Sequence, residues 1–137
     1  MALDGIYVFD EKEKKYKKDL RPNTNDVTKT QKMKFVQFGL KRNLLKGIYS
    51  AEYLFPSPIQ QEAIPAILSK QNILARAKNG TGKTAAYAIP AIHLVDPHNS
   101  APQVLVIVPS RELALQTSSV FEKLANFCQI NVKIFAN

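Results

Sequence analysis

The stretch ILARAKNGTGKTAAYAIPA, residues 73–91, joins an apolar run to a helix-like run through the polar, glycine-rich residues NGTGKT at 79–84. Glycines let a backbone turn tightly and approach a ligand closely, and the first turn of a helix offers free N–H groups and partial positive charge. A lysine and a threonine directly after the second glycine suit the phosphates and the Mg²⁺ of a bound nucleotide. The pattern therefore predicts a phosphate-binding turn between a strand and a helix.

Each residue of this turn has an expected role. Backbone N–H groups of Gly80, Thr81 and Gly82 can wrap a phosphate. Lys83 is expected to reach the β- and γ-phosphates, and the Thr84 hydroxyl to coordinate Mg²⁺. A mobile surface turn is the structural alternative, but the strand before the turn and the helix after it are what a nucleotide-binding loop requires.

Length and composition limit what this turn can belong to. The chain has 137 residues, 45% of them hydrophobic, which suits one compact domain or part of one. A net charge of +8 favours an acidic partner such as nucleic acid or a phosphorylated ligand. No apolar run approaches the ~18 residues that span a bilayer, so we expect a soluble intracellular protein. Cys128 is the single cysteine, which excludes an internal disulfide and favours a small core residue.

Predicted strands and helices alternate after residue 34. Short strands are expected at 72–77 and 132–137, and another at 103–109, where the run is nearly continuously apolar and rich in β-branched residues. Apolar positions at helical spacing predict helices over 40–48, 59–68 and 83–91 and another after Pro109, with Ser110 as its N-cap. Leu113, Val120, Leu124 and Phe127 are expected on the core side of the last helix.

This alternation predicts an α/β fold with a parallel sheet and helices on both faces. Ligands of such sheets bind beyond the carboxyl ends of the strands, where NGTGKT lies. Residues 1–34 are polar and carry the mixed-charge run EKEKKYKKD at 11–19, so they are expected to form an extension before a domain over 35–137.

Two further segments carry polar residues at helix starts. In YLFPSPIQ, residues 53–60, Ser57 at the N-cap and Gln60 three residues later form a capping box in sequence. A glutamine amide can also read the N6 and N7 edge of adenine, and the two roles are compatible. In PSREL, residues 109–113, Arg111 opens a helix, where the helix dipole disfavours a cation unless it faces an anion.

Together these segments carry a family resemblance. Phe35, then YLFPSPIQ, AKNGTGKT at 77–84 and PSREL, in this order and spacing, resemble the upstream aromatic, Q motif, motif I and motif Ia of DEAD-box RNA helicases. The resemblance covers about residues 35–137 and implies part of a RecA-like P-loop domain, with ATP and Mg²⁺ as ligands and single-stranded RNA as a substrate contacted through its backbone.

The resemblance also implies individual roles. Phe35 would stack near the adenine ring, Tyr53 holds the family's aromatic position, and Ser57 would support the P-loop. The implied nucleotide-binding residues are Phe35, Tyr53, Ser57, Gln60, Ala77, Lys78, Asn79, Gly80, Thr81, Gly82, Lys83 and Thr84, of which Lys83 and Thr84 are catalytic and Thr84 binds the metal. The implied RNA-binding residues are Pro109, Ser110, Arg111 and Glu112.

Two departures from the family pattern bear on local conformation. Ala77 stands where the general P-loop pattern has its first glycine. The loop is therefore expected to be one of the P-loop types that accept alanine at this position. Glu52 replaces the glycine that usually opens the Q motif, which affects the turn there rather than the adenine contact.

The segment before the core points to a branch of the family. KDLRPNTNDVTKTQ at 18–31 and FVQFGLKRNLLKGIY at 35–49 are similar to the segment preceding the core in the cytoplasmic branch that represses translation and activates mRNA decapping. The resemblance implies a cytoplasmic location, including mRNA–protein granules, and protein partners of mRNA repression and decay that bind through a second domain.

Three alternatives stay open: an initiation-factor-type helicase, a P-loop ATPase acting on DNA or protein, and a nucleotide-binding fragment without catalysis. The sequence ends at FAN before any D-E-A-D or S-A-T motif. Phosphoryl transfer depends on charges positioned by such motifs. We therefore expect the parent protein to be an ATPase and this stretch alone to be inactive.

Overall fold

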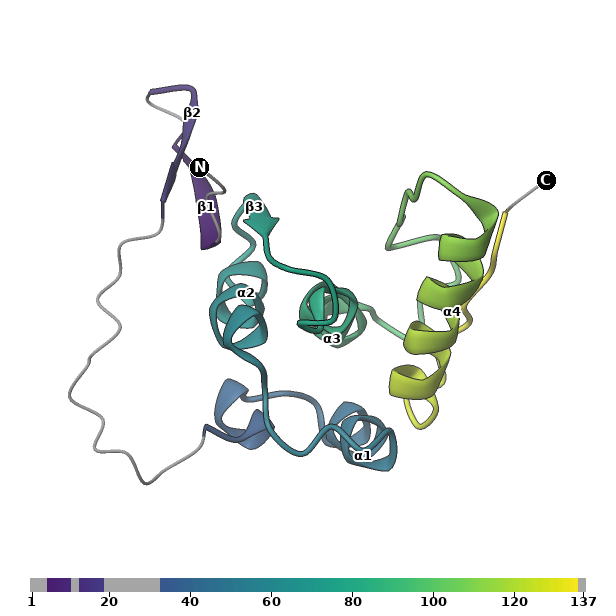
Figure 1. Ribbon diagram of the computed structural model, residues 1–137. Helices are drawn as coiled ribbons and strands as arrows, with labels where there is room; N and C mark the ends of the chain where they lie inside the picture. Colours follow the sequence, from purple (N-terminus) through teal and green to yellow (C-terminus); the bar gives the residue numbers. More distant parts are fainter. Residues whose placement is uncertain (1–4, 11–12, 19–32, 136–137) are drawn as a thin grey trace.

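The computed structural model describes residues 5–10, 13–18 and 33–135, so the predictions for 19–32 and 136–137 lie outside the described residues. The elements, shown in Figure 1, are β1 (Gly5–Asp10), β2 (Lys15–Lys18), the 3-10 helix η1 (Phe35–Phe38), α1 (Arg42–Ser50), α2 (Pro58–Leu68), β3 (Ile73–Arg76), α3 (Lys83–Leu94) and α4 (Arg111–Ala125). None of the helices in this part of the chain is long and apolar enough to cross a bilayer.

The predicted helices are confirmed, and their ends have identifiable causes. Pro58 occupies the first position of α2, where its missing N–H costs nothing. The Oγ of Ser110 accepts a hydrogen bond from the backbone N–H of Leu113 at 3.2 Å and so caps α4. Pro65 lies inside α2 without ending it. The expectation for α4 is correct for Leu124, which is fully buried, and for Val120, which packs against the main cluster, whereas Leu113 and Phe127 are exposed.

The core lies between the helices. Its main cluster joins η1, α1, α2, α3 and α4, and its largest fully buried side chains are Phe35, Leu44, Ile48, Ile64, Ile89 and Leu124. A second cluster of Ile59, Ala63 and Ala86 joins α2 to α3, and Ala77 packs against it. Cys128 is half-buried against the main core, where burial raises the pKa of its thiol. The second cluster fixes the start of α3 against α2 and so positions the glycine-rich turn.

The N-terminus of α1 is tied to the C-terminus of α3. The backbone N–H of Lys41 donates to Nδ1 of His93 at 3.2 Å, and the Lys41 ammonium donates to the carbonyl of Val95 at 2.7 Å. Burial lowers the pKa of His93, and the charge of Lys41 lowers it further. A lowered pKa favours the neutral ring, whose Nδ1 can accept this hydrogen bond.

The sheet differs from the predicted one. Its order is β2-β1-β3, and both pairings are antiparallel, with Tyr7 opposite Leu74 and Val8 opposite both Lys17 and Ile73. The strand at 72–77 is confirmed as β3, whereas 103–108 and 132–135 form no strand in the described chain. The parallel sheet with helices on both faces is therefore not formed by the described residues.

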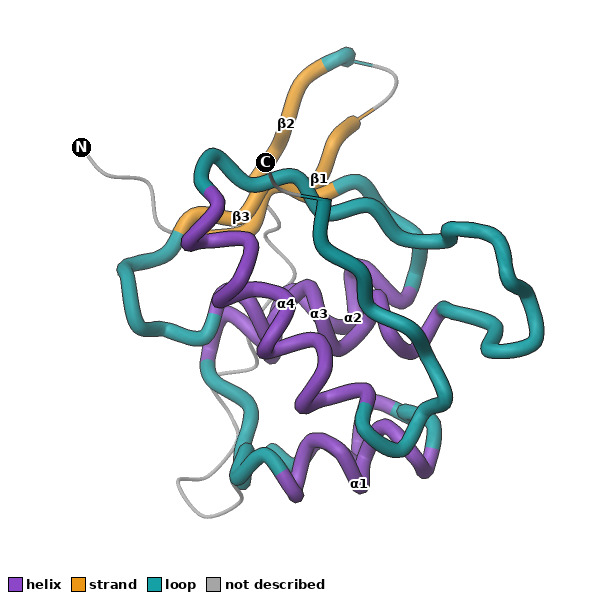
Figure 2. The backbone as a smooth tube through the Cα atoms, turned by 90° about the vertical axis from the view of Figure 1, so that its right-hand side faces the viewer, coloured by secondary structure: helices purple, strands orange, loops and turns teal. Residues whose placement is uncertain are grey.

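The physical reason is the lack of a neighbour for the apolar run 103–109. Figure 1 shows α4 and the segment leading to it on the far side of α3 from β3, and Figure 2 shows that whole segment as a loop. A buried parallel strand requires a hydrogen-bonded partner and cover on both faces. Leu105 and Ile107 instead remain 83% and 85% exposed. The apolar pattern was identified correctly, but no strand of the described chain pairs with this run.

The N-terminal strands were not predicted. GIYVFD at 5–10 is followed directly by the charged run that suggested an extension, and such a short segment gives little periodicity to recognise. In the structure β1 pairs with β3, and it therefore lies beside the strand that leads into the glycine-rich turn. This partner could not be identified from the pattern of either strand.

The backbone conformation at Glu52 bears on the departure from the family pattern at this position. The φ of Glu52 is +64°, in the left-handed region that favours glycine, and the residue follows Ala51, the C-cap of α1. A residue with a Cβ is strained there by about 1 kcal/mol or more. The Q-motif position that usually holds glycine therefore requires that conformation in this chain too.

Glu52→Gly is expected to raise the free energy of unfolding by about 0.5–1 kcal/mol, because relief of strain exceeds the entropy that glycine adds to the unfolded chain. Urea denaturation measures the change. Glu52→Gln removes the charge but keeps the Cβ, and should leave stability unchanged. A stabilised glutamine variant, or an unstabilised glycine variant, would show that backbone strain is not the cause.

Candidate nucleotide-binding site

The glycine-rich turn runs from the end of β3 to the start of α3. Gly80 and Gly82 adopt φ values of +77° and +84°, in the left-handed region that glycine reaches without strain. Lys83 and Thr84 are the first two residues of α3 and are half-buried. The loop hydrogen bond from Thr81 Oγ1 to the carbonyl of Lys78 measures 2.7 Å. The predicted strand–turn–helix arrangement of 77–84 is thus present.

The Lys83 ammonium lies inside this turn. It donates to the carbonyl oxygens of Ala77 at 2.6 Å and Lys78 at 3.1 Å and to Oδ1 of Asn79 at 3.2 Å. An ammonium has three donors, so these acceptors satisfy it fully. The positive charge is thereby held among the backbone groups of the turn, next to the N-terminus of α3, where an anion is favoured by the helix dipole.

Gln60 connects α2 to this turn. Its Oε1 accepts from the backbone N–H of Ser57 at 3.0 Å, and its Nε2 donates to the carbonyl of Gly82 at 3.2 Å. The side chain is 2% exposed. The capping interaction predicted for Gln60 is therefore present, and the amide keeps one further donor hydrogen and one further lone pair.

Gly82 and Ser57 pack closely at this junction. A Cβ placed on Gly82 would lie 2.5 Å from Nε2 of Gln60 and 3.4 Å from Oγ of Ser57. Within the described residues, the buried Oγ of Ser57 has no hydrogen-bond partner. The N-terminus of α2 thus lies against the turn at Gly82.

The two aromatic residues lie in the core rather than at an open surface. Phe35 is 0% exposed, and its ring meets those of Phe38 and Tyr49 edge to face, with centroids 6.3 and 6.5 Å apart. Tyr53 is half-buried against the same cluster. In this conformation Phe35 offers no free ring face to a base.

The segment PSREL opens α4. Pro109, Ser110, Arg111 and Glu112 are all exposed. Ser110 uses its Oγ to cap the helix, and Arg111 occupies the first helical position with Glu112 beside it. Among the described residues, no hydrogen bond or ion pair joins Arg111 to the glycine-rich turn. The structure therefore brings Ser57, Gln60 and residues 77–84 together and leaves Phe35 and Arg111 apart from them.

Two contacts were missed by sequence reasoning. The bond from Gln60 to Gly82 spans 22 residues, and the carbonyls that hold Lys83 belong to the backbone, which sequence does not mark. The sequence contained part of this information. Gln60 was recognisable as a capping residue, and Gly82 lacks a Cβ that would keep a neighbouring side chain at a distance.

Comparison with known proteins identifies the family of this chain. The family model described as DEAD/DEAH box helicase matches residues 57–137, which contain Gln60, the glycine-rich turn and Arg111. The chain belongs to the DEAD/DEAH box helicase family. It is 52% identical over 117 residues to the ATP-dependent RNA helicase DHH1 of Pyricularia oryzae and 54% identical over 117 residues to that of Meyerozyma guilliermondii. These alignments cover 85% of this chain and 22% and 21% of the two relatives.

Solved DEAD-box structures support the fold class. The chain is similar to Saccharomyces cerevisiae Dbp5 bound to RNA and ADP BeF3, with a TM-score of 0.65, 38% identity and coverage of 71% of this chain and 25% of that one. A DEAD box protein from Methanococcus jannaschii gives a TM-score of 0.61 at 35% identity, covering 67% of this chain and 25% of the other. The predicted partial RecA-like α/β domain is confirmed at this level. The chain spans about a quarter of the length of the relatives it matches.

Proposed function

We propose that this DEAD-box chain is the ATP-binding and RNA-contacting part of an ATP-dependent RNA helicase. The observation that carries the proposal is the Lys83 ammonium held inside a turn whose Gly82 is fixed to the Q-motif Gln60. The helicase names of the relatives and the nucleotide bound to Dbp5 agree with it.

In this proposal the turn binds the phosphates of ATP. Phosphate oxygens would replace the carbonyls of Ala77 and Lys78 as partners of the Lys83 ammonium. The new contacts would be stronger, because both partners would then be charged. The fit is supported by the half-buried Thr84 hydroxyl at the second position of α3, which is suited to Mg²⁺. Bound Mg²⁺ would neutralise charge on the phosphates. Gln60 would use its remaining donor and acceptor to read adenine.

We further propose limits to what this stretch does alone. The sequence holds no D-E-A-D or S-A-T motif, so the 137-residue chain should bind nucleotide without turning it over. We take residues 35–137 as the helicase portion, 1–34 as an extension, and mRNA–protein complexes of translation repression and decay in the cytoplasm as the setting. The similarity to DHH1 favours this branch over an initiation-factor-type helicase.

Arg111→Ala tests the RNA contact. If Arg111 binds a backbone phosphate, the substitution should weaken binding of single-stranded RNA similarly for all sequences. The slope of log K against log salt should fall by about 0.7, the value for one phosphate on a single strand. Fluorescence anisotropy of labelled oligo(U) and oligo(A) across a salt series measures both quantities.

The matched control is Lys133→Ala, which removes one exposed positive charge outside the helices. It should leave the salt slope unchanged. An unchanged slope for Arg111→Ala would assign Arg111 to the solvated start of α4. Absence of RNA binding by the unaltered chain would argue against the RNA-contacting part of the proposal.

A further inference from the structure

The helix α1 exposes a cationic stripe that the nucleotide site does not use. Arg42, Lys46 and Tyr49 follow one another at spacings of four and three residues, which places them on one face of a helix. All three are exposed; Tyr49 is 40% exposed as a residue, and its ring packs edge to face with that of the buried Phe35. We call these three residues the α1 stripe. The other face of α1, with Leu44 and Ile48, is buried in the core.

The positive charges around α1 repel one another and the N-terminal end of the helix dipole. Lys41 and Arg42 stand at the positive N-terminal end of α1, whose first turn contains no acidic residue. Arg42 and Lys46 are like charges one turn apart, an arrangement that destabilises a helix. Residues 33–51 contain no aspartate or glutamate. In the described chain the ion pair found joins Lys15 to Glu13, so neither stripe cation is paired.

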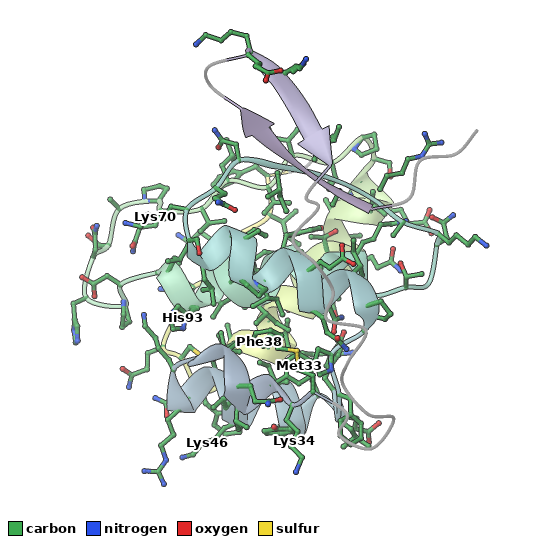
Figure 3. All side chains as sticks on the ribbon, turned by 90° about the vertical axis from the view of Figure 1, so that its left-hand side faces the viewer. Met33, Lys34, Phe38, Lys46, Lys70 and His93 are labelled. Carbon is green, nitrogen blue, oxygen red and sulfur yellow. The ribbon has the colours of Figure 1, made fainter. Side chains whose placement is uncertain are left out.

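Lys34 adds a further charge at the same edge. It is exposed at the N-terminal end of η1, and Figure 3 shows its side chain and that of Lys46 leaving the same side of the molecule. Lys41 contributes less, because its ammonium is held by the carbonyl of Val95, next to Asp96. Three unpaired cations and an exposed tyrosine thus share one surface.

We propose that this surface binds the backbone of single-stranded RNA, apart from the contact at Arg111. The inference rests on the proposed function and extends its RNA footprint. Unpaired cations suit phosphates, and an exposed tyrosine beside them suits a stacked base, which an acidic peptide does not require. Gly47, within α1, packs on Leu124 near the C-terminal end of α4. Arg111 begins that 15-residue helix, so the two surfaces lie ~20 Å apart along it.

The test is a triple variant, Lys34→Gln, Arg42→Gln and Lys46→Gln, in the 137-residue chain. Binding of labelled oligo(U) is measured by anisotropy across a salt series, with polyglutamate of equal length as a second probe. We expect the slope of log K against log salt to fall by about 2, or 0.7 for each of three phosphates. Tyr49→Leu should weaken binding by ~5-fold or more without changing the slope.

The control triple variant, Lys70→Gln, Lys123→Gln and Lys133→Gln, removes the same charge from other exposed positions and should keep the slope of the unaltered chain. ATP affinity should be unchanged in both, which separates this surface from the nucleotide site. If the unaltered chain binds RNA but the α1 variant keeps its slope, or if both triple variants lose slope equally, the inference is wrong while the proposed function stands. Loss of polyglutamate binding with RNA binding intact would assign the surface to an acidic protein and also overturn it.

Discussion

Gly82→Ala is expected to weaken ATP binding by roughly 5-fold or more, the value of one lost hydrogen bond of about 1 kcal/mol. The backbone of Gly82 has φ +84°, and an L-residue in the left-handed region costs about 1–2 kcal/mol of folding free energy, which lowers stability rather than ATP affinity. The added Cβ would also meet Nε2 of Gln60 at 2.5 Å. Because Gln60 is buried and bonded on both sides, moving it sacrifices the bond to Gly82, worth about 1 kcal/mol. Isothermal titration calorimetry of ATP binding measures the loss.

Gly39→Ala is the matched control for this substitution. Gly39 also has a positive φ, +68°, but a Cβ there would meet nothing within 4 Å, and the residue lies between η1 and α1. It should lose a similar amount of stability and retain ATP affinity. Wild-type affinity in Gly82→Ala, or equal loss in both variants, would mean that close packing of the turn against Gln60 does not govern nucleotide binding.

Gly47→Ala is expected to produce the largest loss of stability. A Cβ on Gly47 would clash with the backbone carbonyl of Leu124, where α1 crosses α4. Neither helix backbone can move without separating the two helices, and such overpacking costs typically 1–3 kcal/mol or more. The gain in helix propensity from glycine to alanine, about 1 kcal/mol, offsets only part of this. Urea or thermal denaturation followed by circular dichroism measures the change.

Lys46→Ala is the control for an alanine in the same helix without the clash, because Lys46 is the exposed neighbour of Gly47 and lysine and alanine have similar helix propensities. It should leave the midpoint nearly unchanged. A Gly47→Ala chain that fails to fold agrees with the clash, whereas one as stable as the unaltered chain would show that α1 and α4 do not pack this closely.

The local features of the site could be predicted from the sequence, whereas the pairing of the strands could not. NGTGKT, the Ser57 start of α2 and the Ser110 cap of α4 were predictable, because loop, cap and helix chemistry act within a few residues. Strand pairing depends on segments far apart in sequence. The run 103–109 was apolar as expected yet has no partner within reach, and β3 pairs instead with β1, which lies in the polar N-terminal region.

Within the site, the distinction is similar. Residue types indicated which side chains belong to the turn, but not that Gln60 would reach Gly82 or that Phe35 would be buried among Phe38 and Tyr49. An aromatic residue suits stacking on a base and packing in a core equally well. Its location in the fold decides between them.

The most direct test of the central proposal is calorimetric titration of ATP into the 137-residue chain and its Lys83→Ala and Lys78→Ala variants. Lys83 contributes its ammonium to the turn, whereas Lys78 contributes a carbonyl and its side chain is not required. Loss of a charged hydrogen bond costs about 1.5–3 kcal/mol, so Lys83→Ala should weaken ATP binding by roughly 10- to 150-fold while Lys78→Ala binds normally. ATP binding that is unaffected by Lys83→Ala would contradict the assignment of NGTGKT as the phosphate site.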